Sequence, residues 1–330
     1  MKLPQRAGKI TARTCKSNKV MTETKKNFSG LGRRQFLRSI FGLGSVAEGA
    51  QLEVEARSAS SGKFFWTDLK TGQVGFPSGH AVPSGQPGSI MKLVAAAALI
   101  DGKLFSSDEK IECRGLYKSN HETYKCLHAH GLVDMVNAIG MSCNVYFAHV
   151  SERMSARTIL DYAQKFGLSQ PVAEFESGAF PFYEHQGQPS VSYVLGLAPD
   201  LQPSALQILR LSALIARDGH IPYMHSAERP NPGALPYEIT LSEACWKVLK
   251  QGMQIASRQG TGKKLDPENK LKVAIKTGTT PHGSSFQSWI TGFFPWDDPR
   301  YAFVLRAPAG TSQDEAVPQA HTFLFSVEWP

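Results

Sequence analysis

The segment from residue 91 to residue 100, MKLVAAAALI, restricts the fold of this 330-residue chain more than any other feature. It follows a Pro87-Gly88 turn and carries a single charged residue, Lys92, among apolar ones. A helix that is apolar on every side is stable only when other structure surrounds it. The chain must therefore enclose this helix, and its length and its 42% hydrophobic content suffice for one large domain or two modest ones.

Further helices are predicted by apolar periodicity and by capping residues. Residues 155–168 form an amphipathic pattern closed by Gly167, residues 204–219 begin at a potential N-cap, Ser204, and residues 241–257 carry Ser242 in the first turn. Residues 132–154 also read as helical stretches. The polar residues 111–131 and the Pro/Gly-containing residues 170–190 are expected to be irregular.

Strands are expected at the two ends of the folded region. Residues 63–76 read as two short strands around a Lys70-Thr71-Gly72 turn, and residues 271–280, 284–294 and 300–308 as strands at hairpin spacing. With helices between them, this order predicts an α+β fold. We expect an antiparallel sheet formed by both chain ends, with an all-helical subdomain.

The net charge of +8 is concentrated at one end of the chain. Residues 1–50 hold 11 lysines and arginines against 2 acidic residues, whereas the remaining 280 hold 25 against 26. The folded region therefore has no net positive charge that would favour binding to nucleic acid. No run of eighteen apolar residues is present, so no membrane-spanning helix is expected.

The basic leader resembles a twin-arginine export signal. Arg33 and Arg34 are followed by Phe36-Leu37 and then by a short, weakly apolar run. We therefore expect residues 1–58 to be a leader and residues 59–330 to be the folded domain, acting in the periplasm or elsewhere outside the cytoplasmic membrane. A basic tail without a targeting role is the alternative interpretation.

Three short motifs occur in a fixed order along the domain. They are Ser89-Ile90-Met91-Lys92 at the start of the apolar helix, Ser142-Cys143-Asn144 between helical stretches, and Lys276-Thr277-Gly278 on a strand. Each occurs often by chance, and Lys70-Thr71-Gly72 repeats the third. In this order they are the motif set of the penicillin-recognising serine acyltransferases.

The residues around the motifs restrict the resemblance to one family. PGSIMKL, SCNVYF and IKTGTT are similar to elements of the penicillin-binding protein transpeptidase domain, although Ile275 stands where that family usually has glycine. The likeness extends from about Phe64 to the C-terminus. It implies the fold of penicillin-binding transpeptidases and β-lactamases.

The resemblance also implies roles for individual residues. Ser89 would be the nucleophile, Lys92 its base and Ser142 a proton shuttle, because a serine hydroxyl attacks well only when a neighbour takes its proton. Burial, and a second cation such as Lys276, would lower the pKa of Lys92 and so suit it to that role. The expected substrate-binding residues are Asn144, Lys276, Thr277, Gly278 and Thr279, with the backbone N–H groups of Ser89 and Thr279 as an oxyanion hole.

Cysteine and histidine residues gather before the second motif. Cys113, His121, Cys126, His128 and His130 match no standard zinc-finger spacing, so no metal and no cofactor is expected. An oxidising compartment would allow a disulfide between Cys113 and Cys126. Cys143 and Cys245 lie in apolar stretches and are interpreted as small core residues.

The sequence therefore predicts a peptidoglycan D,D-transpeptidase-like enzyme that forms an acyl-serine at Ser89. The expected ligands are D-Ala-D-Ala stem peptides and β-lactams, and other cell-wall synthesis proteins are candidate partners. The alternatives are a D,D-carboxypeptidase, a serine β-lactamase, or a non-catalytic penicillin-binding sensor. The residues after Asn144 contain no Glu-x-x-Leu-Asn element to supply a deacylating base, which counts against the β-lactamase.

Overall fold

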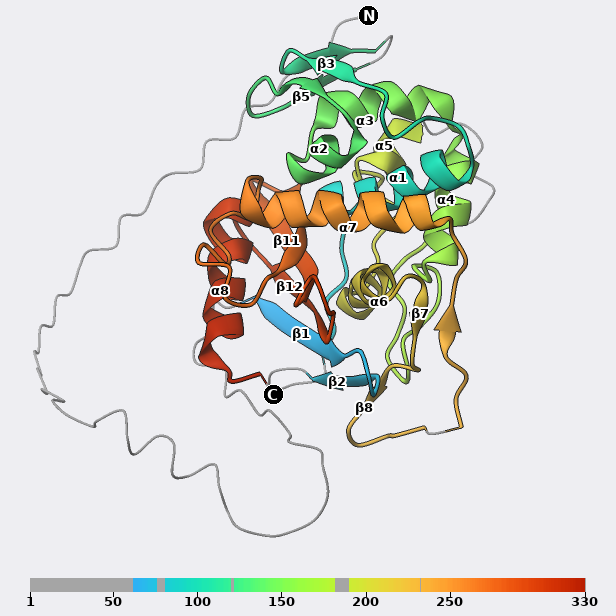
Figure 1. The fold of residues 1–330 in the computed structure, drawn as a ribbon, viewed down its shortest axis with the longest axis vertical. Coiled ribbons are helices and arrows are strands. Elements are labelled where there is room, and N and C mark those ends of the chain that lie inside the picture. Colours follow the sequence, from blue (N-terminus) through green and yellow to red (C-terminus); the bar gives the residue numbers. More distant parts are fainter. Residues whose placement is uncertain (1–61, 76–80, 120–121, 182–189, 232, 330) are drawn as a thin grey trace, which may run out of the picture. The chain divides into compact units, whose positions relative to one another are not determined.

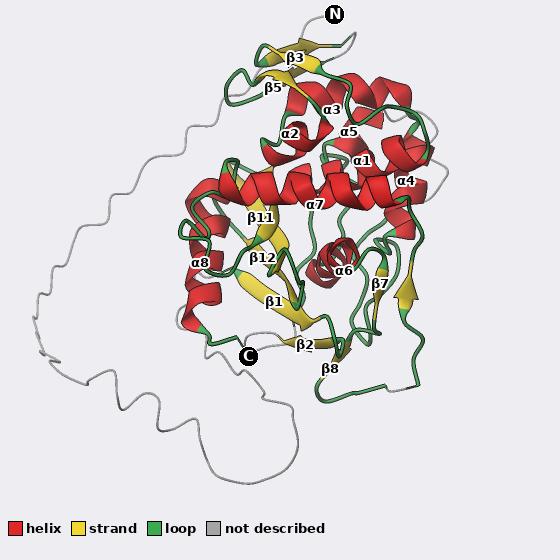
Figure 2. Ribbon diagram, viewed as in Figure 1, coloured by secondary structure: helices red, strands yellow, loops and turns green. Residues whose placement is uncertain are grey.

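A computed structural model describes residues 62–75, 81–119, 122–181, 190–231 and 233–329. The predicted leader, residues 1–58, lies outside the described residues, as does His121. The α+β prediction is confirmed, since a mainly antiparallel sheet is combined with a large group of helices (Figure 2). Among the described residues, no helix has the length and apolar content needed to cross a bilayer.

The central sheet joins the two ends of the described chain. Its order is β10-β11-β12-β1-β2-β8. β1 lies beside β12 (Figure 1) and pairs antiparallel with it, so that Lys63 lies opposite Arg306. β10 is therefore an edge strand. The bounds are β1 (Lys63–Asp68), β2 (Gln73–Gly75), β8 (His225–Ser226), β10 (Ala274–His282), β11 (Ser285–Phe294) and β12 (Tyr301–Ala307).

Each face of the sheet has its own apolar cluster. Along β12, Phe303 and Leu305 pack in the cluster that contains α8 (Val317–Ser326), whereas Val304 packs in the cluster that contains α6 (Ala205–Ala216). This alternation is the period of two that a strand imposes on its side chains. The sheet is therefore covered on both faces, which explains why its central strands are almost entirely buried.

The helical subdomain surrounds α1 (Met91–Asp101), as its apolar sequence requires. Every residue of α1 from Met91 to Leu99 is buried, including Lys92. α7 (Glu243–Arg258) runs between the sheet and this subdomain and contacts both α1 and β10 (Figure 1). The other helices are α2 (Met135–Gly140), α3 (Asn144–Val150), α4 (Ala156–Lys165) and α5 (Ser190–Val194).

The predicted helix starts are confirmed by their capping bonds. Ser204 and Gln207 form a reciprocal capping box at α6, and Ser242 accepts a hydrogen bond from the Cys245 backbone N–H at α7. Gly167 after α4 has a φ of 78°, which an L side chain would adopt only with strain. Local sequence therefore determines these boundaries.

The expectation for residues 111–131 was wrong. Instead of an irregular loop, this part of the chain forms two strand pairs, β3 with β6 and β4 with β5. Strands of three residues are too short to show an alternating pattern in the sequence. Their bounds are β3 (Ile111–Cys113), β4 (Leu116–Lys118), β5 (Thr123–Lys125) and β6 (Gly131–Val133).

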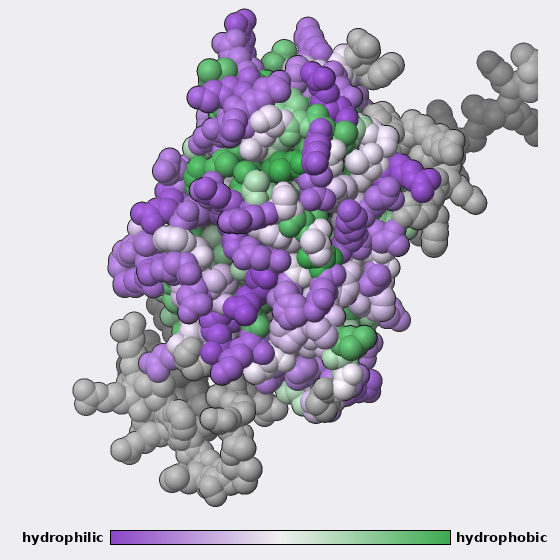
Figure 3. Space-filling view, turned by 45° about the vertical axis from the view of Figure 1, so that its right-hand side comes forward, coloured by the Kyte–Doolittle hydropathy of each residue, from purple (hydrophilic) through white to green (hydrophobic). Residues whose placement is uncertain are grey.

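Several other elements were not predicted. α8 follows the last strand, where only strands were expected. The pair β7 (His220–Ile221) and β9 (Tyr237–Glu238), and the short helical turns η1 (Gly88–Ile90), η2 (Ser151–Arg153) and η3 (Ser312–Ala316), were also missed. The surface in Figure 3 is mostly hydrophilic with small apolar groups, as expected of a domain whose large apolar residues are mostly inside.

Candidate active site

Ser89 lies in η1, one helical turn before Lys92, at the start of the buried α1 helix. The turn approaches β10 closely, because a Cβ atom on Gly88 would lie 2.9 Å from the Thr279 backbone nitrogen. Gly88 has a φ of 57°, and its N–H donates to the Gly196 carbonyl at 3.1 Å. Only glycine meets both the backbone angle and the close contact at this position. The nucleophile candidate is thus held beside the edge strand.

Lys92 points from α1 toward the second motif. Its Nζ donates to Asn144 Oδ1 at 2.6 Å, to the Ser142 carbonyl at 2.8 Å and to Ser142 Oγ at 3.4 Å. The Phe147 ring centroid lies 5.6 Å from the same nitrogen. The lysine is therefore a buried, hydrogen-bonded group and not an exposed charge on a solvated helix face.

The second motif is the junction between α2 and α3. Ser142 has a φ of 54°, a backbone conformation that is uncommon outside glycine and costs free energy. Asn144 is the first residue of α3, and its Nδ2 donates to the Lys125 carbonyl at 2.8 Å. The side-chain amide of Asn144 therefore connects Lys92 to the end of β5 as well as to α3.

The third motif lies on the edge strand β10. Lys276 Nζ donates to Ser142 Oγ at 3.0 Å and to the Thr277 carbonyl at 2.9 Å. Gly278 lies against η1, where a Cβ atom would be 2.2 Å from the Pro87 carbonyl oxygen. Thr279 Oγ1 accepts from the Ser312 backbone N–H at 3.1 Å. All three motifs therefore meet at one place, and β10 contacts η1 there.

The two lysines share an environment that disfavours positive charge. Burial lowers the pKa of Lys92 to about 8, although the nearby Cys143 and Cys126 partly oppose this effect. Burial lowers the pKa of Lys276 well below its ordinary value, and the charge of Lys92 lowers it further. Two adjacent buried ammonium groups repel each other, so the pair readily gives up a proton.

The other copy of the third motif is a turn. Asp68 Oδ1 accepts hydrogen bonds from the backbone N–H groups of Lys70 and Thr71, between β1 and β2. Lys70 is exposed there. Position in the chain, and not the tripeptide, decides which copy reaches the site.

Two supporting residues were not predicted. Thr261, after α7, shares a 2.7 Å hydrogen bond with the hydroxyl of Thr277, and Gly196 accepts from Gly88. Thr261 stands in a Gly-Thr-Gly stretch, which signals a turn but not a contact with a distant strand.

The cysteine and histidine residues also differ from the sequence expectation. Cys113 and Cys126 are free thiols whose sulfurs lie 3.8 Å apart, and Cys143 Sγ lies 3.8 Å from Cys126 Sγ. Cys143 is buried, as predicted for a core residue, but it faces the other thiols. Cys245 is buried elsewhere, in α7.

The chain matches the family model described as the penicillin binding protein transpeptidase domain, over residues 80–323. Penicillin-binding protein PbpB of Mycolicibacterium smegmatis is 26% identical over an alignment of 272 residues, and the match covers 72% of this chain and 42% of that protein. Stage V sporulation protein D of Bacillus subtilis is 23% identical over an alignment of 257 residues, and the match covers 69% of this chain and 39% of that protein. The chain thus spans about two fifths of the length of these relatives.

Solved structures agree in fold. Pseudomonas aeruginosa PBP2, solved in complex with WCK 5153, has a TM-score of 0.71 at 20% identity and covers 82% of this chain and 74% of its own. The transpeptidase domain of Burkholderia pseudomallei penicillin-binding protein 3 has a TM-score of 0.67 at 18% identity, with coverage of 82% and 90%. With the family model matching most of its length and three motifs meeting in one site, the chain belongs to the penicillin-binding protein transpeptidase domain family.

Proposed function

We propose that the protein is a peptidoglycan D,D-transpeptidase-like serine acyltransferase with Ser89 as its nucleophile. One observation carries the proposal: Lys92 and Lys276, from separate motifs, both donate to the hydroxyl of Ser142, at 3.4 and 3.0 Å. Lys92 is thus a base one helical turn after the nucleophile, Ser142 is a hydroxyl that can relay protons, and Lys276 is a cation for an anionic substrate.

Acylation follows from these roles. The Ser89 oxygen bonds to the carbonyl carbon of the penultimate D-Ala as its proton passes to neutral Lys92. The C–N bond then breaks, and the leaving D-Ala amine takes a proton from Ser142, which Lys92 resupplies. The backbone N–H groups of Ser89 and Thr279 bind the developing oxyanion, and such a donor is worth roughly 3–4 kcal/mol.

The substrate carboxylate is proposed to bind at β10. Lys276 supplies charge, and Thr277 and Thr279 supply hydroxyl groups. Gly278 leaves room for η1 to approach. Because a bound carboxylate favours the cation at Lys276, and a neighbouring cation disfavours a second one, substrate binding keeps Lys92 neutral. Beyond its hydrogen bonds with Lys92 and the Lys125 carbonyl, Asn144 retains one N–H and one lone pair for the substrate amide.

The acyl-serine ester is then resolved by an amine or by water. Attack by the amine of a second stem peptide gives a cross-link, and attack by water gives D,D-carboxypeptidase activity. A β-lactam acylates the same serine. Within the described part of the chain, Lys92, Ser142 and Lys276 form hydrogen bonds to amide, carbonyl and hydroxyl groups and to no carboxylate, which favours a long-lived β-lactam adduct over rapid turnover.

The proposed place of action is outside the cytoplasmic membrane, reached through the twin-arginine-like leader at Arg33-Arg34. Cell-wall synthesis proteins are the proposed partners. Support comes from similar folds solved in a peptidoglycan synthase complex and, for Helicobacter pylori PBP2, in a complex with MreC.

Labelling with a fluorescent penicillin tests the proposal. The wild-type chain should form a covalent adduct that Ser89→Ala abolishes and Ser326→Ala, an exposed serine in α8, retains. A stem-peptide analogue should release D-Ala with the wild type and with Ser326→Ala, but not with Ser89→Ala. Labelling that persists in Ser89→Ala would refute the proposed nucleophile, and stable labelling without D-Ala release would identify a penicillin-binding sensor.

A further inference from the structure

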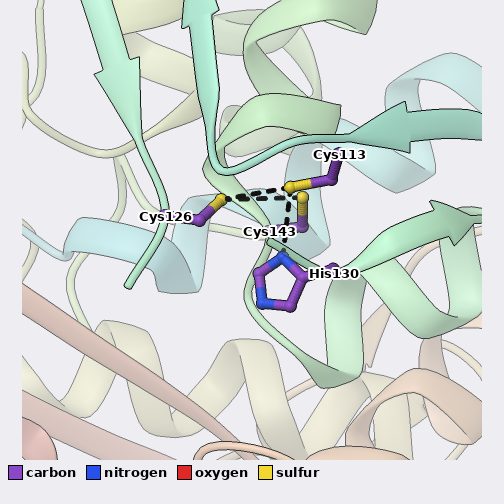
Figure 4. Close-up of side chains that lie close together, drawn as sticks. All are labelled: Cys113, Cys126, His130 and Cys143. Carbon is purple, nitrogen blue, oxygen red and sulfur yellow. Dashed lines mark hydrogen bonds between the residues drawn. The ribbon is translucent and has the colours of Figure 1, made fainter. Parts of the chain in front are cut away.

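Four metal-binding side chains meet beside the second motif. The ligand atoms of Cys113, Cys126, His130 and Cys143 all lie within 4.8 Å of one another, and Figure 4 shows them converging from separate strands, loops and a helix start. We propose that these four residues form a structural Zn²⁺ site that fastens the hairpin segment, residues 111–133, to the second motif. Three thiolates and one imidazole in a tetrahedron are a typical zinc ligand set.

The spacing of the ligand atoms fits that ion. Zinc binds sulfur at about 2.3 Å and nitrogen at about 2.0–2.1 Å, so in a regular tetrahedron two sulfurs lie about 3.8 Å apart and sulfur and nitrogen about 3.5 Å apart. The structure has Cys113 Sγ and Cys143 Sγ each 3.8 Å from Cys126 Sγ, and His130 Nδ1 3.4 Å from Cys113 Sγ. These three separations therefore match tetrahedral coordination, and all four ligand atoms lie within 4.8 Å of one another.

The same separations do not suit a disulfide. A disulfide bond holds two sulfurs about 2.05 Å apart, and it would leave the third thiol of the cluster unpaired. A single metal ion uses all three thiols together with the imidazole. The sequence spacing of Cys113, Cys126, His128 and His130 did not indicate this set, because Cys143 comes from the second motif and replaces His128.

Backbone hydrogen bonds to the sulfurs also fit a metal site. The N–H of Val145 lies 3.5 Å from Cys126 Sγ, and the N–H of Tyr146 lies 3.3 Å from Cys143 Sγ, both at the start of α3. Donors of this kind stabilise thiolate ligands and fix their direction.

The hairpin segment has few fully buried residues, although Ile111, Tyr117 and Tyr124 pack against the core. In β3 to β6, the buried residues are Cys113 and Val133, and Leu132 is 65% exposed. Leu127, in the loop after β5, is 88% exposed. A bound metal ion stabilises a segment of this kind by crosslinking it to the rest of the domain. The proposed ion supplies this crosslink where the strand pairs contact α3.

The site also has a consequence for the second motif. Cys143 stands between Ser142 and Asn144, and the Lys125 carbonyl that accepts from Asn144 directly precedes Cys126. The metal would therefore hold both sides of the contact that positions Asn144. This inference does not depend on the reaction that the site performs.

Metal analysis of the full chain, purified without a polyhistidine tag, tests the site. We expect about one zinc ion per chain. Cys126→Ser and His130→Ala should lose most of it, and Cys245→Ala, which removes a buried thiol outside the cluster, should keep it. Replacing zinc by Co²⁺ should give the visible bands of tetrahedral thiolate coordination.

The wild-type chain provides a second test that needs no variant. Stripping zinc with a chelator under reducing conditions should increase hydrogen exchange in residues 111–133, and adding Zn²⁺ should restore protection. A purified chain that neither contains nor binds zinc would overturn the proposal. So would a disulfide among the three cysteines, found by alkylation and mass spectrometry, or equal zinc loss in Cys245→Ala.

Discussion

Lys276 donates a 3.0 Å hydrogen bond to the hydroxyl of Ser142, although 134 positions separate the two residues in the sequence. The bond crosses from the edge strand of the sheet to the junction between α2 and α3. It unites the sheet and the helical subdomain at the point where Lys92 also arrives. Changes at this junction should therefore affect acylation much more than they affect stability.

The repeated Lys-Thr-Gly tripeptide offers a matched pair of variants. Lys276→Ala should lower the rate of penicillin acylation about 10- to 100-fold, because a hydrogen bond to a charged group contributes roughly 1.5–3 kcal/mol. Lys70→Ala, in the exposed β1–β2 turn, should leave the rate unchanged. Stopped-flow measurement with a chromogenic β-lactam compares them, and equal effects would show that the β10 lysine has no special role.

The pH dependence of acylation should follow the protonation of Lys92. Only its neutral form accepts a proton from Ser89, and burial lowers its pKa to about 8. The rate should therefore rise as pH increases toward about 8 and level off above it.

A Lys92→Met variant provides the control for this profile. Its acylation rate should be about 10²- to 10⁴-fold lower, as is typical when a general base is removed. The increase of the rate with pH should also disappear. A wild-type rate that stays flat between about pH 6 and 8 would contradict the assignment of Lys92 as the base.

Alanine substitutions at two glycines with the same φ angle distinguish the effect of a steric contact from the effect of backbone strain. Gly88 and Gly283 both have a φ of 57°, but an added Cβ meets Thr279 at 2.9 Å in the first case and nothing within 4 Å in the second. Gly283→Ala should cost about 1–2 kcal/mol of stability and retain acylation. Gly88→Ala should also push η1 away from β10. Acylation should then slow about 100-fold, because a small displacement of a catalytic group can cost that much. Denaturant unfolding and penicillin labelling measure both, and normal labelling of Gly88→Ala would contradict the proposed packing.

The buried helix α1 should dominate stability. Leu99→Ala should lower the free energy of unfolding by about 2–5 kcal/mol, because a fully buried leucine leaves a cavity. Leu235→Ala, at a residue that is 85% exposed, should change it by less than about 0.5 kcal/mol. Urea denaturation followed by fluorescence gives the comparison, and a small loss for Leu99→Ala would mean that α1 is less enclosed than described.

Removing the proposed zinc ion should impair the active site indirectly. A chelator should slow penicillin acylation about ten-fold or more by loosening Ser142 and Asn144, and added Zn²⁺ should restore it. The Cys245→Ala variant should respond as the wild type does. If the stripped chain acylates at the full rate, the metal holds the hairpin segment but not the second motif.

Local signals in the sequence were sufficient for the main helices and the long strands. Apolar periodicity and the serines at the caps predicted α4, α6 and α7, and alternating residues predicted β10 to β12. They failed for β3 to β6, whose three-residue strands have no readable period, and for α8. The three motifs were visible because their order along the chain is a property of the sequence itself.

The sequence alone therefore determined the main helices and the long strands, that α1 must be enclosed, and the order of the three motifs. Packing decided the rest. Only the folded chain brings Lys92 and Lys276 to one hydroxyl, separates the β10 tripeptide from its copy at Lys70, and turns Cys143 toward Cys113, Cys126 and His130. The physical reason is that the distance between side chains far apart in the chain depends on how helices and strands pack, and no local pattern of residues encodes it.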